Sequence, residues 1–188
     1  MSTLKNTSQS YGWLAIAIHW VFAFTVFGLF GLGLYMVELT YYDPWYRGSL
    51  DLHKSIGVVL FAVLLFRVFW GVINIQPTPE PGKAWEHFIA SAVHGLLYLL
   101  PLMLMMSGYL ISTADGRAIE VFGLFSIPAL PESLDVLYVR SIEDFHGDLH
   151  ELLAWSLIGL AGLHAAAALK HHFIEKNRTL TRMLGIKN

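Results

Sequence analysis

The sequence predicts an all-α integral membrane protein, a four-helix bundle in one domain that covers residues 1–188 and has both termini in the cytoplasm. Hydrophobic residues make up 55% of the chain and charged residues only 14%, whereas a soluble domain carries about 25% charged residues. Four apolar runs are each long enough to cross the hydrocarbon core of a bilayer, which takes about 20 helical residues. The formal net charge of −2 gives no indication of a nucleic-acid partner.

Each apolar run predicts one membrane span. The first run, 13–37, is longer than the apolar part of a signal peptide, which has about 7–15 residues, so we expect a retained helix. The second, third and fourth predicted spans are 52–73, 88–111 and 149–174. Pro101 lies inside the third span and should kink it, because proline removes a backbone hydrogen bond from a helix.

The distribution of basic residues predicts the orientation, since cytoplasmic loops are enriched in lysine and arginine. With four spans, one side of the membrane holds the N-terminus, the second loop and the C-terminal tail, and eight of the 12 lysines and arginines lie toward that side. That side is therefore predicted to be the cytoplasm. The long connection between the third and fourth spans, 112–148, then faces outward, with seven acidic residues against two basic residues.

His150 and His164 are the most informative pair in the chain. They lie 14 residues apart, which turns a helix by about 1400°, within about 40° of four full turns. Both imidazoles therefore project from one face of the fourth span, about 21 Å apart along its axis. Ionisable residues inside a membrane are costly and usually functional, so this stripe is typical of ligands for two stacked metal cofactors.

Depth in the membrane pairs these two histidines with histidines of other spans. His19 lies near the inner end of the first span, at the level of His164, and His53 lies at the outer level of His150. Each pair offers two neutral imidazoles, the ligation that suits a b-type haem. The chain has no cysteine, which excludes thiolate-held iron–sulfur clusters and the attachment motif of c-type haem. We therefore expect two b haems per chain.

Other interpretations of the histidines stay open. Each of the four could instead make hydrogen bonds between helices. His146 lies one turn before His150 on the same stripe and is an alternative outer ligand. His94, inside the third span, is expected to pack or to hydrogen-bond, although it could line a haem edge or a quinone pocket.

Three further residues at the inner level are candidates for cofactor contacts. Arg67 lies 14 residues after His53 and on the same face. It is expected either to pair with a propionate of the inner haem or to reach the lipid phosphates. His171 and His172 follow Lys170 at the inner mouth. They are expected to be solvated by lipid headgroups or to deliver protons to a quinone bound near the inner haem.

Several motifs resemble those of the bacterial cytochrome b561 family, which is related to the cytochrome b subunits of nickel–iron hydrogenases and formate dehydrogenases. The motifs lie along nearly the whole chain: Ala17–Trp20, Leu52–Gly57, Val93–Leu99, Gly108–Gly116 and the run from His150 through His164 to Phe173. The resemblance implies four helices in the inner membrane and two b haems, with the four histidines paired above as axial ligands. It also implies a link to quinones, because some members resemble quinone oxidoreductases and one type passes electrons from superoxide to ubiquinone.

These observations favour transmembrane electron transfer through two bis-histidine b haems, coupled to ubiquinone or another quinone of the respiratory chain. Superoxide:ubiquinone oxidoreductase activity is an alternative, but the acidic outer loop disfavours it, since superoxide is an anion. Lys54, Arg117 and Arg140 could still form a local basic patch. A membrane anchor subunit that docks a periplasmic redox protein on the acidic loop is a further alternative. A histidine-lined zinc or copper transporter is the alternative from another class, although its pathway would be expected to include intramembrane carboxylates.

Overall fold

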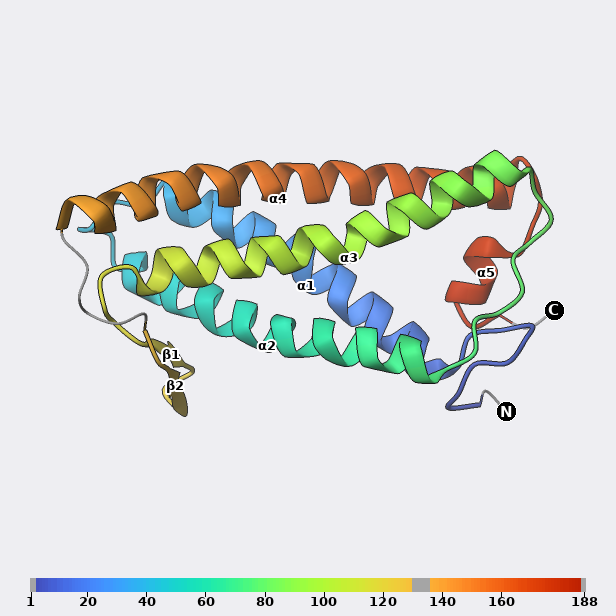
Figure 1. Cartoon of the computed structure of the whole chain (residues 1–188), viewed down its shortest axis with the longest axis horizontal. Helices are drawn as coiled ribbons and strands as arrows, with labels where there is room; N and C mark the ends of the chain where they lie inside the picture. The colour runs from blue at the N-terminus through green and yellow to red at the C-terminus, as the bar shows by residue number, and fades with distance from the viewer. Residues whose placement is uncertain (1–2, 130–135, 187–188) are drawn as a thin grey trace. The chain divides into compact units, whose positions relative to one another are not determined.

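The structure of the chain is a computed structural model, and it describes residues 3–129 and 136–186. Four long helices dominate these residues (Figure 1): α1 (Trp13–Val37), α2 (Tyr46–Ile73), α3 (Ala84–Thr113) and α4 (Val136–Phe173). They are accompanied by two short strands, β1 (Ile119–Val121) and β2 (Phe125–Ile127), and by a short helix, α5 (Thr179–Met183). Each long helix contains a segment long and apolar enough to cross a membrane, which confirms the predicted all-α membrane bundle.

The helix α1 has the predicted bounds, whereas the other long helices start earlier than predicted. α2 starts at Tyr46 and α3 at Ala84. At the start of α3, the carboxylate of Glu86 in the first turn accepts a hydrogen bond from the backbone N–H of Lys83 (3.0 Å). This contact satisfies one of the amides that a helix start leaves without a partner, so the helix begins in the polar layer before its apolar run. α3 continues through Pro101, and the kink expected there stays a prediction.

The connection predicted over 112–148 is wrong in its second half. α4 starts at Val136 and has 38 residues, because a helix does not have to stop where charged residues interrupt the apolar run. The segment of α4 that can span a membrane is Asp144–Phe173. The first half of the connection holds β1 and β2, whose three-residue strands are too short for an alternating pattern to be recognised. Two of the seven acidic residues lie in 130–135, outside the described residues.

Contacts divide the chain into two compact units, each of which takes one segment from every long helix. The terminal unit comprises Met1–Phe24, Val63–Tyr98 and Ile158–Asn188, and it holds both ends of the chain. The hairpin unit comprises Thr25–Ala62 and Leu99–Leu157, and it holds β1 and β2. The inner candidates of the sequence analysis therefore belong to the terminal unit and the outer candidates to the hairpin unit.

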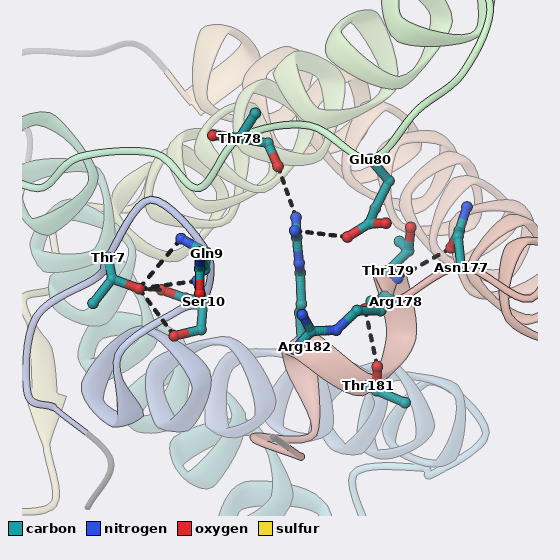
Figure 2. A network of polar contacts seen from close by, with 10 residues as sticks. All are labelled: Thr7, Gln9, Ser10, Thr78, Glu80, Asn177, Arg178, Thr179, Thr181 and Arg182. Carbon is teal, nitrogen blue, oxygen red and sulfur yellow. Dashed lines mark hydrogen bonds and ion pairs between the residues drawn. The ribbon is translucent and has the colours of Figure 1, made fainter. Parts of the chain in front are cut away.

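In the terminal unit, polar contacts join the N-terminal segment, the α2–α3 connection and the C-terminal tail. Figure 2 shows the contacts between the connection and the tail. The guanidinium of Arg182 donates to the carbonyl of Thr78 (2.7 Å) and forms an ion pair with Glu80 (2.7 Å). The backbone N–H of Thr78 donates in turn to the carbonyl of Ser8 (2.8 Å). These three segments share one end of the unit, as a chain with four spans requires. That this end faces the cytoplasm stays a prediction.

In the hairpin unit, β1 and β2 pair antiparallel and form a hairpin. The side chains of Ile119 and Val121 are buried. The hydroxyl of Ser55, on α2, accepts a hydrogen bond from the backbone N–H of Phe122 (3.0 Å) and donates one to the carbonyl of Glu120 (3.3 Å). The hairpin is therefore fixed to the first half of α2.

Candidate functional site

Two pairs of histidine rings lie between helices, one pair in each unit. In the terminal unit, the ring centre of His19 on α1 lies 6.5 Å from that of His164 on α4, with the planes inclined by 61°. In the hairpin unit, the ring centres of His53 on α2 and His150 on α4 lie 6.3 Å apart, with the planes inclined by 62°. The structure thus brings together the same two pairs that depth in the membrane predicts.

The spacing within each pair fits two imidazoles on opposite sides of one metal ion. An imidazole nitrogen binds a metal at about 2 Å and the ring centre lies about 1 Å behind it, so two such rings have centres about 6 Å apart. A direct hydrogen bond of about 3 Å between the two rings would bring their centres to about 5 Å. The separations of 6.5 Å and 6.3 Å match the first arrangement better.

In the hairpin unit, Ser107 determines which ring nitrogen of His150 carries the proton. The hydroxyl of Ser107 has one proton, which it donates to the carbonyl of Leu104 (2.8 Å). The contact of 3.0 Å between this hydroxyl and Nδ1 of His150 is therefore donated by the ring. A neutral His150 then carries its proton on Nδ1 and a lone pair on Nε2, which is the nitrogen left to bind a metal.

Two glycines leave room for the rings of the hairpin-unit pair. A side-chain carbon at Gly108 would lie 3.1 Å from Cε1 of His150, and one at Gly33 would lie 3.6 Å from Cε1 of His53. The first distance is tighter than ordinary contact, so Gly108 allows the His150 ring to lie against α3. Nδ1 of His53 is buried and has no hydrogen-bond partner among the described residues. Nδ1 of His146 is buried and unpaired in the same way, so this nitrogen does not by itself distinguish the rings that bind a cofactor.

In the terminal unit, Arg67 contacts the histidine pair directly. Its Nη2 lies 3.0 Å from Nδ1 of His19, and its Nε donates to the hydroxyl of Tyr98 (3.2 Å). Arginine has donors only, so Nδ1 of His19 accepts this hydrogen bond. The guanidinium also lies over the rings of Tyr98 (5.1 Å) and Phe22 (5.6 Å). Arg67 therefore lies at the predicted level, and its contact with a haem propionate stays a prediction.

His94 lies beside the terminal-unit pair, with its ring centre 5.2 Å from that of His164. This fits its expected role as a packing residue or as part of the lining of a haem edge. Sequence reasoning missed Tyr98 and Phe22 as partners of Arg67, and it missed Ser107 as the partner of His150. Gly108 lies in one of the motifs quoted above, but its spacing gave no indication of the ring that it faces.

At the end of α4, His171 belongs to a partly exposed charged cluster. Its Nδ1 lies 2.5 Å from Oε2 of Glu175, and Nζ of Lys170 lies 2.7 Å from Oε1 of the same carboxylate. The hydrogen bond from Lys170, and after it the one from His171, hold the pKa of Glu175 below its usual value. His172 packs its ring edge against Phe173, with centres 4.8 Å apart. Glu175, which joins the predicted Lys170 and His171, was not predicted from the sequence.

Contacts bear on two alternatives from the sequence, which are His146 as the outer ligand and a bare metal ion held by histidines. The ring beside His53 is that of His150, whereas His146 packs against Phe145 with ring centres 5.1 Å apart. Within residues 3–129 and 136–186, no group of three or more histidine, cysteine, aspartate or glutamate side chains is placed to hold a bare metal ion. A metal held by two histidines needs a cofactor that brings further ligands of its own, as a haem does.

A sequence-family model for prokaryotic cytochrome b561 matches residues 10–185, nearly the whole chain. The chain belongs to the prokaryotic cytochrome b561 family. The family and the four membrane-spanning helices identify this cytochrome b561 as a multi-pass inner-membrane protein that binds haem b and transfers electrons.

Curated relatives of this cytochrome b561 cover most of its length. Cytochrome b561 homolog 2 of Escherichia coli K12 is 48% identical over 184 residues, which are 97% of this chain and 95% of that protein. A Yersinia pestis protein named probable superoxide oxidase CybB is 29% identical over 181 residues, 94% of this chain and 96% of its own. Cytochrome b561 homolog 1 of Escherichia coli K12 is 30% identical over 131 residues, 69% of this chain and 68% of its own.

Proposed function

We propose that this cytochrome b561 carries electrons across the inner membrane through two b haems, one in each unit, and exchanges them with the quinone pool. His19 and His164 would hold the haem of the terminal unit, and His53 and His150 that of the hairpin unit. The observation that carries the proposal is the spacing of the two ring pairs, 6.5 Å and 6.3 Å. Haem b, when bound, supplies a one-electron redox couple, whose potential the protein adjusts through ligands and their neighbours.

The chain's own residues orient the ligands. Ser107 accepts the Nδ1 proton of His150 and so fixes the ring with Nε2 free (3.0 Å). Such outer partners hold the tautomer and the orientation of a metal-binding histidine. Arg67 holds His19 in the opposite way, because it donates to Nδ1 and so leaves the proton of a neutral ring on Nε2. Arg67 must give up this hydrogen bond before Nε2 of His19 can bind haem iron, and we propose that a haem propionate of the terminal unit then takes up its donors.

Reduction of a quinone by two electrons also consumes two protons. We propose that this reaction takes place at the terminal unit, because residues that can carry protons gather there. Lys170, His171 and Glu175 form a continuous hydrogen-bonded cluster at the end of α4. The side chains of Lys170 and Glu175 are 49% and 32% exposed, which leaves the cluster open to water. We propose that this cluster, with His172 next to it, passes protons between water and a quinone bound in this unit.

Superoxide is the second candidate for the electron donor, because the Yersinia pestis relative is named a probable superoxide oxidase. Asp115 compensates the predicted basic patch only in part. Arg117 forms an ion pair with this carboxylate, and the hydrogen bond from Arg117, together with the nearby charge of Lys54, holds the pKa of the Asp115 carboxyl below its usual value. The side chain of Arg140 lies outside the described residues. The acidic excess over 112–148 favours a neutral quinol or a reduced partner over an anion.

Electron transfer across a bilayer tests the proposal directly. Liposomes that contain the purified chain and trapped ferricyanide would receive a quinol in the membrane or superoxide outside. We expect ferricyanide to be reduced with quinol, and the rate to fall to background in both His53→Ala and His164→Ala. Reduction that survives in either variant would contradict transfer through two sites in series. A rate with superoxide far above the rate with quinol would select the second candidate.

A further inference from the structure

The turn of the hairpin carries an exposed apolar tip. Phe122 is 52% exposed, Leu124 81% and Phe125 53%, and we call these three residues the hairpin tip. The other side of the hairpin is well packed, because Ile119 and Val121 are buried. The hairpin is thus an ordered element with one apolar end that nothing in its own unit covers among the described residues.

The backbone conformation of this turn disfavours a large side chain such as that of Phe122. Phe122 has a φ of 51° and Gly123 a φ of 67°, and the turn closes with a hydrogen bond from Leu124 N–H to the carbonyl of Val121 (2.9 Å). Positive φ is unfavourable for a bulky residue, and such turns normally use glycine, asparagine or aspartate. Phenylalanine at this position is therefore unfavourable for the turn, and a contact of its side chain outside the hairpin would offset that cost.

The attachment of the hairpin to α2 places it where α2 changes from polar to apolar. Arg47, Asp51 and Lys54 give the first turns of α2 their charge, whereas no charged residue occurs from 55 to 66. Ser55, which binds the backbone of Glu120 and Phe122, is the first residue after this change. Counting back about 20 residues from the end of α2 at Ile73 puts the edge of the hydrocarbon core at the same point.

Exposed aromatic residues lie just before α2 as well. Tyr41 is 66% exposed, Tyr42 93% and Trp45 57%. Figure 1 shows the hairpin beside the beginning of α2, the end of the helix that this aromatic segment precedes. Tyrosine and tryptophan gather at membrane–water interfaces, where an apolar ring and a polar group can both be accommodated. The aromatic segment and the hairpin tip therefore lie at the same end of α2.

We propose that the hairpin tip inserts into the headgroup layer of the membrane that α2 crosses. It would thereby anchor the hairpin over the part of α2 that carries His53. The occupant is lipid because the hairpin is bonded at the edge of a membrane span, and the apolar side chains of that span already face the bilayer. The favourable transfer of Phe122, Leu124 and Phe125 out of water would offset the unfavourable backbone at Phe122.

Spin labelling tests the anchor in the full chain with its haems, in lipid nanodiscs. The chain has no cysteine, so Leu124→Cys offers one labelling site, and its high exposure makes the substitution compatible with folding. Gln9→Cys, on the exposed N-terminal segment, is the aqueous control, and Phe24→Cys, 68% exposed within α1, is the lipid control. Collisions with oxygen, which accumulates in lipid, are compared with collisions with a nickel chelate, which stays in water.

We expect the oxygen-to-nickel collision ratio at Leu124→Cys to exceed that at Gln9→Cys severalfold and to stay below that at Phe24→Cys. A ratio equal to that of Gln9→Cys would overturn the proposal. Protection from both reagents in native membranes, combined with a ratio like that of Gln9→Cys in nanodiscs, would mean a protein partner and would also overturn it. Magnetic broadening between labels on two copies in one nanodisc would point to self-association instead of lipid.

Discussion

The two histidine pairs have nearly the same spacing, but their neighbours differ. In the hairpin unit, His150 donates to Ser107, a neutral hydroxyl. In the terminal unit, His19 accepts from Arg67, a permanent cation that Tyr98 also holds. Ring spacing therefore indicates which cofactor fits, whereas the neighbours make the two sites unequal. Arg67 also lies in the apolar part of α2, where a charge persists only with partners.

The largest expected effect comes from the ligands themselves. His150→Ala should remove the haem of the hairpin unit and leave that of the terminal unit, and His164→Ala should do the reverse. Absorption spectra of the reduced proteins would identify which component each variant loses. His146→Ala is the matched control on the same helix and should keep both components. Loss of a haem in His146→Ala, with none in His150→Ala, would exchange their roles.

Gly108→Ala should impair the hairpin-unit site selectively. The added carbon would lie 3.1 Å from Cε1 of His150, so the ring must shift or α3 must move away. Gly33→Ala, with a contact of 3.6 Å to His53, should have a small effect, and Gly31→Ala meets nothing within 4 Å. Haem content after purification measures the series. Equal haem content in all three variants would contradict close packing of His150 against α3.

Arg67→Leu should destabilise the terminal unit more than Ser107→Ala destabilises the hairpin unit. It removes two hydrogen bonds from a charged donor and leaves His19 and Tyr98 without that partner, at a cost of about 2–3 kcal/mol. Ser107→Ala removes the hydroxyl to which the ring N–H of His150 donates, at a cost of about 1 kcal/mol. The midpoints of thermal unfolding compare the two variants. A larger fall of the unfolding midpoint in Ser107→Ala than in Arg67→Leu would contradict the expected order.

The smallest expected effects concern the polar ends of the units. Arg182→Ala removes the contacts with Thr78 and Glu80 in the terminal unit. Ser55→Ala removes the two contacts that fix the hairpin. Each should cost about 1 kcal/mol and leave both haems in place. Hydrogen exchange should show faster opening of the α5 segment in the first variant and of β1 and β2 in the second. Faster exchange throughout both units would contradict local roles.

Much of the fold could be predicted because a membrane span leaves a strong signal in the sequence. The bounds of α1 were found because polar residues flank its apolar run closely. The start of α4 was missed, since helical hydrogen bonding continues over charged residues that end an apolar run. The hairpin was missed because neither strand is long enough to show a period, and its attachment at Ser55 joins residues that lie far apart in the chain.

The histidine pairs could be predicted because spacing within one helix and depth across the membrane are both readable from sequence. Their neighbours could not. Ser107 meets His150 across two helices, and Tyr98 meets Arg67 in the same way. Such contacts depend on how each helix is rotated about its axis, which side-chain packing decides and which hydrophobic content alone does not. Ser107 precedes Gly108, so the close approach at this point of α3 depends on two adjacent small residues.

Two b haems on the two histidine pairs are proposed for each chain. Haem content per chain is measured on protein purified from haem-replete membranes, with an independent protein determination. We expect two haems per chain, both low-spin in the oxidised spectrum, as two imidazole ligands on each iron require. One haem per chain, none, or a high-spin component that signals an open ligand position would contradict the proposal.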